Sequence, residues 1–175
     1  TTTYAHDALN RVTGITYPDA TTVAYAYDEK GNRTSLEDAA GTTSYAYDSL
    51  DRLASVTDPF GLTVAYTYDP SGNRSSTRYP GNRAVRYLFD ELGRLVRVDD
   101  WGGVATTYAY DQAGRLATQV MGNGATVSYA YDHAGRLVGK EDRSAAGTLI
   151  ASYAYTLDEN GNRVGLDLAQ PLLPD

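Results

Sequence analysis

The stretch Tyr66-Thr67-Tyr68-Asp69-Pro70-Ser71-Gly72-Asn73-Arg74 decides the fold, because variants of it recur through nearly the whole chain. Eight copies, spaced 21, 20, 21, 21, 21, 21 and 24 residues apart, begin near Tyr4, Tyr25, Tyr45, Tyr66, Tyr87, Tyr108, Tyr129 and Tyr153. A fixed period near 21 residues indicates a repeat architecture, in which each unit buries its apolar face only against its neighbours. We expect an array of about eight repeats over residues 1–166 and a non-repeat tail over residues 167–175.

Each repeat carries the chemistry of a tight turn directly after its tyrosines. Asp stands first and Gly usually fourth, which is typical of a type I turn that ends in a left-handed residue and closes a three-residue hairpin loop with a bulge at the Gly. The two repeats without Gly have Asn10 and Asp51, residue types that tolerate positive φ. The turn residues that we expect to be structural are Asp28, Gly31, Asp69, Gly72, Asp90, Gly93, Asp111, Gly114, Asp132 and Gly135.

A second turn lies about ten residues further along each repeat, as in Asp58-Pro59-Phe60-Gly61. Each repeat then holds two strands of roughly six residues, and the chain holds about sixteen antiparallel strands. No apolar pattern of helical period survives the glycines. We therefore predict an all-β fold of tandem antiparallel hairpins in a continuous curved or spiralling meander.

The turn also predicts a strand register, with Asp90 and Arg94 closing one loop. The expected pairs are Phe89–Leu95, Leu88–Val96 and Tyr87–Arg97 in that repeat, and Tyr47–Leu53 and Ala46–Ala54 in another. Because strand side chains alternate between faces, tyrosines with Leu or Val should occupy one face, and Asp, Arg and small residues the other.

Three repeats place Asn at the closing position and move Arg one residue on, as in Gly72-Asn73-Arg74. A shift of one residue moves a strand side chain to the other face. We therefore expect Arg74 on the tyrosine face as a cation–π partner of Tyr68, and Arg94 on the opposite face.

Composition limits the possible functions. The net charge of -7 and pI near 4.7 argue against nucleic acid as a partner. The absence of Cys excludes disulfides and thiolate metal sites, and neither a membrane-length apolar run nor a signal peptide occurs. His6 and His133 occupy non-equivalent positions of the repeat, and no paired carboxylates, nucleophile elbow or phosphate loop stands out. We predict no catalytic residue, no cofactor, no metal and no membrane insertion.

The run Tyr-x-Tyr-Asp-x-x-Gly-[Arg/Asn]-[Leu/Arg] resembles the YD repeat of the Rhs family over about residues 1–166. That family includes bacterial polymorphic toxins, the C components of insecticidal toxin complexes, and the animal teneurins. The resemblance implies a hairpin strip that spirals into a hollow shell. It further implies a secreted or cell-surface protein, which we expect to be bacterial. In the toxin members of the family, the shell encloses a toxic polypeptide.

Three hypotheses concern the role of the chain as a whole. The leading hypothesis is a non-enzymatic structural segment whose partner is an enclosed polypeptide or other copies of the chain. An alternative is a self-assembling subunit of an extracellular filament, joined through open strand edges. The third is an enzyme, for example an autoprotease.

A further alternative is a binding surface for glycans along the tyrosines. Aromatic rings stack on sugars, and nearby polar groups orient them. The candidate residues for such a ligand face are Tyr45, Tyr47, Tyr66, Tyr68, Arg74, Tyr108 and Tyr110. The competing interpretation is that this face is simply the packed side of the sheet.

Overall fold

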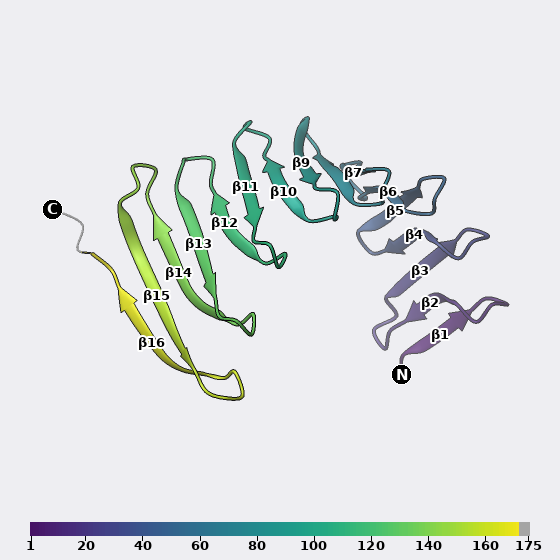
Figure 1. The fold of residues 1–175 in the computed structure, drawn as a ribbon. Coiled ribbons are helices and arrows are strands. Elements are labelled where there is room, and N and C mark those ends of the chain that lie inside the picture. The colour runs from purple at the N-terminus through teal and green to yellow at the C-terminus, as the bar shows by residue number, and fades with distance from the viewer. Residues whose placement is uncertain (172–175) are drawn as a thin grey trace. The chain divides into compact units, whose positions relative to one another are not determined.

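A computed structural model describes residues 1–171, and within them every regular element is a β-strand. The strands are β1 (Thr3–His6), β2 (Val12–Thr16), β3 (Thr22–Tyr27), β4 (Arg33–Asp38), β5 (Gly41–Tyr47), β6 (Leu53–Thr57), β7 (Thr63–Tyr68), β8 (Arg74–Tyr79), β9 (Arg83–Phe89), β10 (Leu95–Asp99), β11 (Ala105–Tyr110), β12 (Leu116–Val120), β13 (Thr126–Tyr131), β14 (Leu137–Arg143), β15 (Leu149–Leu157) and β16 (Arg163–Ala169). Their order in the sheet follows the chain (Figure 1). The predicted all-β hairpin meander is confirmed. Residues 1–171 contain no helix that could cross a membrane.

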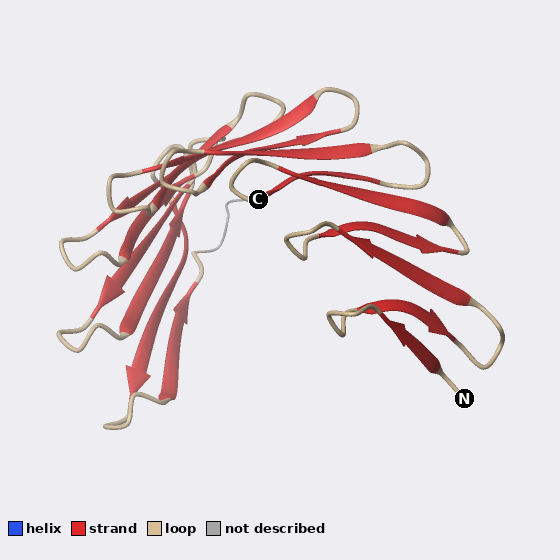
Figure 2. Ribbon diagram, turned by 90° about the vertical axis from the view of Figure 1, so that its right-hand side faces the viewer, coloured by secondary structure: helices blue, strands red, loops and turns tan. Residues whose placement is uncertain are grey.

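The chain divides into two compact units, Thr1–Ala84 and Val85–Asp175. Tight loops join consecutive strands within each unit (Figure 2). Little of the described chain is buried: only Val127, Ala151 and Thr77 fall to 3–4% exposure. Contacts between neighbouring hairpins, and not a closed core, therefore hold each unit together.

The turn after each tyrosine pair has one repeated geometry, which Asp90 illustrates. Gly93 N–H donates to the Asp90 carbonyl, and Asp90 N–H donates to the Arg94 carbonyl, both at 2.9 Å. The Asp90 carboxylate also accepts the N–H groups of Leu92 and Arg94. Gly93 has φ of 74°, and Asn10 takes the same left-handed conformation at 61° in the first repeat. Local hydrogen bonds and one left-handed residue thus form the turn.

The register agrees with the prediction at the first pair beyond the turn and then departs from it. Phe89 pairs with Leu95, and Tyr47 with Leu53, as expected. The predicted pairs Leu88–Val96, Tyr87–Arg97 and Ala46–Ala54 are wrong; the observed pairs are Leu88–Arg97, Tyr87–Val98 and Ala46–Ser55.

A β-bulge causes this departure, because it leaves Val96 and Ala54 as extra residues on the return strands. The bulge sets aliphatic Val98 opposite Tyr87 on the less exposed face. It places charged Arg97 on the exposed face. Apolar burial therefore favours the shifted register.

The last hairpins are longer than the others. β14 has 7 residues and β15 has 9, and a turn at Ser144–Gly147 joins them. Tyr155 pairs with Leu166 as Tyr66 pairs with Thr77, so Tyr155 holds the first tyrosine position before the Asp158 turn. Residues 167–169, which the sequence analysis put in the tail, pair with β15 as part of β16. Tail residues 172–175 lie outside the described residues.

Candidate functional site

One face of the sheet carries the tyrosines and is the less exposed one. In β7, Val64, Tyr66 and Tyr68 are half-buried, whereas Thr63 and Thr67 are exposed. We call this side, with the equivalent positions in other strands, the tyrosine face. The two tyrosines of each motif are the first and the second tyrosine.

The second tyrosine of a motif joins its hairpin to the preceding one. The Tyr68 hydroxyl donates to the Leu53 carbonyl at 2.8 Å, across 15 residues of sequence. The same bond recurs as Tyr27 to Val12 (2.8 Å), Tyr47 to Arg33 (3.0 Å), Tyr110 to Leu95 (2.8 Å) and Tyr131 to Leu116 (2.9 Å). These hydroxyls therefore donate to backbone carbonyls inside the sheet, and their O–H groups are not free to donate to a ligand.

The arginine that closes a turn contacts the same tyrosine ring. Arg52 Nε donates to Asp48 at 2.8 Å, and Arg52 Cζ lies 4.3 Å from the Tyr68 ring centre. Equivalent ring contacts are Arg11–Tyr27 (4.7 Å), Arg94–Tyr110 (4.6 Å) and Arg115–Tyr131 (4.6 Å). We call the set of turn Asp, closing Arg and following second tyrosine the turn ladder. It connects successive repeats through side chains.

The predicted placement of Arg94 opposite the tyrosine face is wrong, because its guanidinium lies over the Tyr110 ring. Arg94 closes a loop and does not lie in the strand β10, which begins at Leu95. Strand alternation consequently does not govern its direction. Its long side chain pairs with Asp90 of its own turn and extends to the Tyr110 ring of the next hairpin.

The carboxylates of the turn ladder are stabilised in their charged form. Hydrogen bonds from the side chain and backbone N–H of Arg52 lower the pKa of Asp48. The backbone N–H of Arg94 lowers the pKa of Asp90, desolvation opposes this, and the Arg94 side chain adds to it. The carboxylates of the turn ladder are therefore ionised at neutral pH.

Arg74 departs from its predicted contact. It pairs with Tyr68 in the strand register, as expected, but its guanidinium lies 5.4 Å from the Tyr66 ring, and the predicted Arg74–Tyr68 cation–π contact is wrong. Arg52 already occupies the Tyr68 ring. In the turn before Arg74, Asn73 donates to Asp69 at 3.0 Å in the role that arginine has elsewhere, which leaves Arg74 without a carboxylate.

Three arginines lie over tyrosine rings and have no carboxylate partner within the described residues. Arg33 lies 4.5 Å from the Tyr45 ring and 5.9 Å from the Tyr25 ring, and Arg163 lies 3.8 Å from the Tyr155 ring. Among residues 1–171, the side chains of Arg33, Arg74 and Arg163 have no ion pair or hydrogen bond. An arginine one position later in the repeat therefore does not bond the turn carboxylate, and its guanidinium is available to another group.

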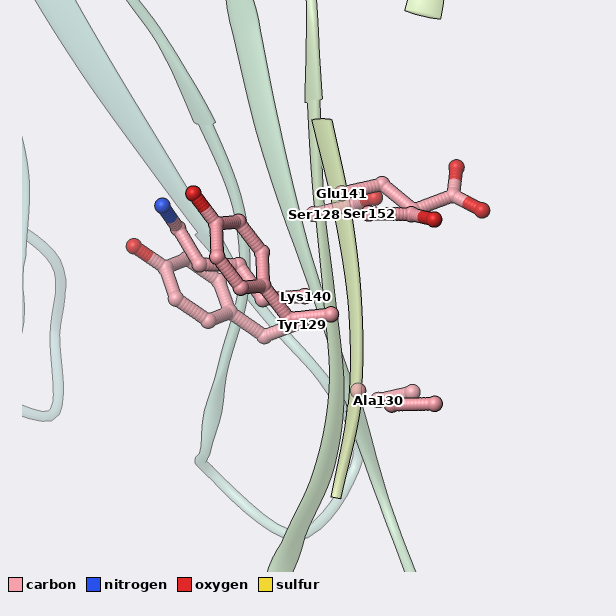
Figure 3. Close-up of a pocket in the computed structure, with 9 residues that line it drawn as sticks. Ser128, Tyr129, Ala130, Lys140, Glu141 and Ser152 are labelled. Atoms are coloured by element: carbon pink, nitrogen blue, oxygen red, sulfur yellow. The ribbon is translucent and has the colours of Figure 1, made fainter. Parts of the chain in front are cut away.

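A second cluster on this face lies over β13, β14 and β15, where Lys140 pairs with both Tyr129 and Tyr153. Figure 3 shows Tyr129 and Lys140 on one side of the sheet, and Ser128 and Glu141 on the other. Tyr129, Lys140 and Tyr153 are among the residues that line a depression of about 310 Å³. Lys140 Nζ lies 5.1 Å from the Tyr153 ring centre.

Asp142 neutralises this lysine. Lys140 donates to Asp142 at 2.9 Å, and this hydrogen bond raises the pKa of Lys140. The sequence analysis did not identify the cluster. The sequence did contain a signal for it: Lys140 stands at a repeat position that two other repeats fill with the aliphatic residues Val56 and Val98.

The candidate ligand residues fall into two groups. The hydroxyls of Tyr47, Tyr68 and Tyr110 are bonded within the sheet. The first tyrosines Tyr45, Tyr66 and Tyr108 have no such bond in the part of the chain that the structure describes. Tyr45 and Tyr66 lie in the first unit, and Tyr108 lies in the second. Within residues 1–171, no three His, Asp or Glu side chains form a metal-binding group.

Comparison with known proteins gives a family match. The family model of the Teneurin YD-shell matches residues 1–127. Among solved structures, the TcdB2-TccC3-Cdc42 complex is 16% identical, with a TM-score of 0.82 over 99% of this chain and 11% of that chain. TcdB2-TccC3 without its hypervariable C-terminal region is also 16% identical, with a TM-score of 0.81 over 98% of this chain and 11% of that chain. The Photorhabdus luminescens Tc holotoxin pore is 15% identical, with a TM-score of 0.55 over 97% and 12%.

At these identities the likeness is one of fold. The chain spans about a ninth of the length of the first two structures. No curated protein sequence matches it.

Proposed function

We propose, because the chain belongs to the Teneurin YD-shell family, that it is a non-enzymatic structural segment forming part of an enclosing β-wall in a larger secreted or cell-surface protein of bacterial origin. The observation that supports this role is the turn ladder. It uses polar groups of the repeat in contacts between hairpins, such as the Tyr68 hydroxyl to the Leu53 carbonyl and the Arg52 guanidinium over the Tyr68 ring.

The geometry suits a wall that extends in one direction. Within each unit, consecutive hairpins are joined by backbone pairing, and Tyr27, Tyr47, Tyr68, Tyr110 and Tyr131 add a side-chain bond to the preceding hairpin, so repeats add in series. Similar repeats occur in the solved TcdB2-TccC3 toxin complexes. We propose that the wall encloses a polypeptide.

Protease protection in the full-length protein tests the enclosing role. The double variant Arg52→Asn and Tyr68→Phe weakens the turn ladder, and the enclosed polypeptide should be digested faster than in the wild type. The matched variant Arg78→Asn and Tyr66→Phe alters similar groups outside the turn ladder and should leave digestion unchanged. Equal digestion in both variants and in the wild type would show that no enclosure depends on this wall.

A separate experiment tests the alternative that the chain is an autoprotease. The purified chain, incubated at neutral pH and followed by intact-mass spectrometry, should keep one unchanged mass. Fragments that appear at a rate independent of chain concentration would indicate autoproteolysis and contradict the structural role.

A second function, assembly into a filament, is favoured by the exposed edge of β16. Among residues 1–171, this strand has β15 as its single pairing partner, and it presents Val164, Leu166 and Leu168 at 64%, 50% and 50% exposure. Open apolar edges pair readily with other strands. Size-exclusion chromatography with negative-stain microscopy tests this: threads that disappear on Leu166→Lys support a filament, and discrete particles contradict it.

A further inference from the structure

The arginines near the tyrosine face of the first unit form two chemical classes. Arg11 and Arg52 are neutralised by Asp7 and Asp48 of their own turns. Arg33 and Arg74 lie over tyrosine rings without any carboxylate. A guanidinium without a carboxylate keeps its fork of N–H donors available to an anionic group.

Arg33 has the best-formed surroundings of the free arginines. It is half-buried, and its guanidinium lies within 6 Å of two ring centres, those of Tyr25 and Tyr45. The hydroxyls of both tyrosines have no hydrogen-bond partner among the described residues. By contrast, Tyr27 and Tyr47, two residues further along the same strands, bond to backbone carbonyls. Two free phenol groups and one free cation therefore meet on one face.

The cluster of Tyr129, Lys140 and Tyr153 provides an internal comparison (Figure 3). It has the same order of ring, cation and ring on paired strands. Its lysine, however, is bonded to Asp142 at 2.9 Å. Within residues 1–171, the arrangement keeps an uncompensated positive charge between two tyrosines only at Arg33.

We propose that Tyr25, Arg33 and Tyr45 form a binding site for an acidic saccharide of the uronate class. The carboxylate of a uronate fits the planar fork of Arg33. The apolar face of a sugar ring stacks on a tyrosine ring, and the sugar hydroxyls bond to the two free phenols. An acidic peptide supplies the carboxylate but no rigid hydroxylated ring, so the saccharide uses all three side chains.

Charge on the surrounding face agrees with an anionic ligand. Arg74 over Tyr66 repeats the available cation in the same unit, four strand spacings or about 19 Å from β4. The strand β4 carries Glu37 on the opposite face, paired with Ala24, and its only other acid, Asp38, is at the strand end. An oligomeric ligand that crosses these strands meets both free arginines.

Isothermal titration of the chain with tetragalacturonate at low salt tests the proposal. Arg33→Gln should weaken binding about tenfold, the loss expected for one charge-assisted hydrogen bond. Arg78→Gln removes the same charge from an exposed residue on the opposite face, paired with Ala65, and should leave the affinity unchanged. The methyl ester of tetragalacturonate, which lacks the charge, should bind as weakly to the wild type as the acid binds to Arg33→Gln.

Several results would overturn the site. They are no binding by the wild type, an equal loss in Arg33→Gln and Arg78→Gln, or equally tight binding of poly-L-glutamate, which would indicate general attraction of anions. If circular dichroism shows that Arg33→Gln is unfolded, the double variant Tyr25→Phe and Tyr45→Phe decides, since it keeps the rings and removes only free hydroxyls. Unchanged affinity in a folded double variant contradicts the proposal.

Discussion

Removal of the Tyr68 hydroxyl should destabilise the first unit, whereas removal of the Tyr66 hydroxyl should not. The two tyrosines lie on the same face of β7, two residues apart. The Tyr68 hydroxyl donates to the Leu53 carbonyl at 2.8 Å, and the Tyr66 hydroxyl has no partner among residues 1–171. A net hydrogen bond contributes about 1 kcal/mol, so Tyr68→Phe should lower the free energy of unfolding by about that amount, and Tyr66→Phe should change it by less than about 0.5 kcal/mol.

The ring of Tyr68 makes a separate contribution through Arg52, whose Cζ lies 4.3 Å from its centre. Arg52→Asn removes the guanidinium and introduces the residue that the chain itself uses at Asn73, where the amide bonds the turn carboxylate. A double-mutant cycle of Arg52→Asn with Tyr68→Leu therefore isolates the ring contact. Its coupling energy should be about 0.5–1 kcal/mol.

Urea denaturation followed by far-UV circular dichroism measures these differences, and hydrogen exchange of β6 and β7 locates them. Repeat proteins can unfold in parts, so the exchange data show whether the loss is local. Two results would refute the reasoning. One is an equal loss in Tyr66→Phe and Tyr68→Phe. The other is a coupling energy below about 0.2 kcal/mol, which would mean that the Arg52 contact contributes no stability.

Acid should destabilise the chain, because the pKa of Asp48 lies below its ordinary 3.8. The contribution of Asp48 to the free energy of unfolding is present above about pH 4 and is lost as the pH falls through the lowered folded pKa. Urea denaturation at a series of pH values from 7 to 2 measures this loss. Gly72→Ala should lower the free energy of unfolding by about 1 kcal/mol through backbone strain alone, because φ is 92° and no atom lies near the added methyl. Gly72→Asn should lower it by less, because Asn10 adopts a left-handed conformation in the first repeat. Equal thermal melts of the two variants would contradict this. Gly122→Ala should cost about 1–3 kcal/mol, because its Cβ would overlap Val104, and Val104→Ala should restore part of that in the same melts.

Much of the local structure was predictable because its causes lie within a few residues. The Asp90 turn needs only the carboxylate, the backbone N–H groups two and four residues on, and a left-handed Gly93. The first pair beyond the turn, Phe89–Leu95, follows from the loop length. The bulge at Val96 was not predicted, because it depends on whether Arg97 or Val98 of the return strand buries the Tyr87 ring better.

The sequence by itself determined that this protein is a chain of hairpins, since period, turn chemistry and strand alternation act over short distances. Only the tertiary structure decided which tyrosine hydroxyls are used in the wall and which remain free. Tyr47 and Tyr45 differ by two positions on one strand, yet only Tyr47 meets a carbonyl of the preceding hairpin. The placement of Arg52 over Tyr68 and of Arg33 between two rings was likewise settled between repeats. Such contacts depend on the stagger of neighbouring hairpins, and a pattern within one repeat does not contain that stagger.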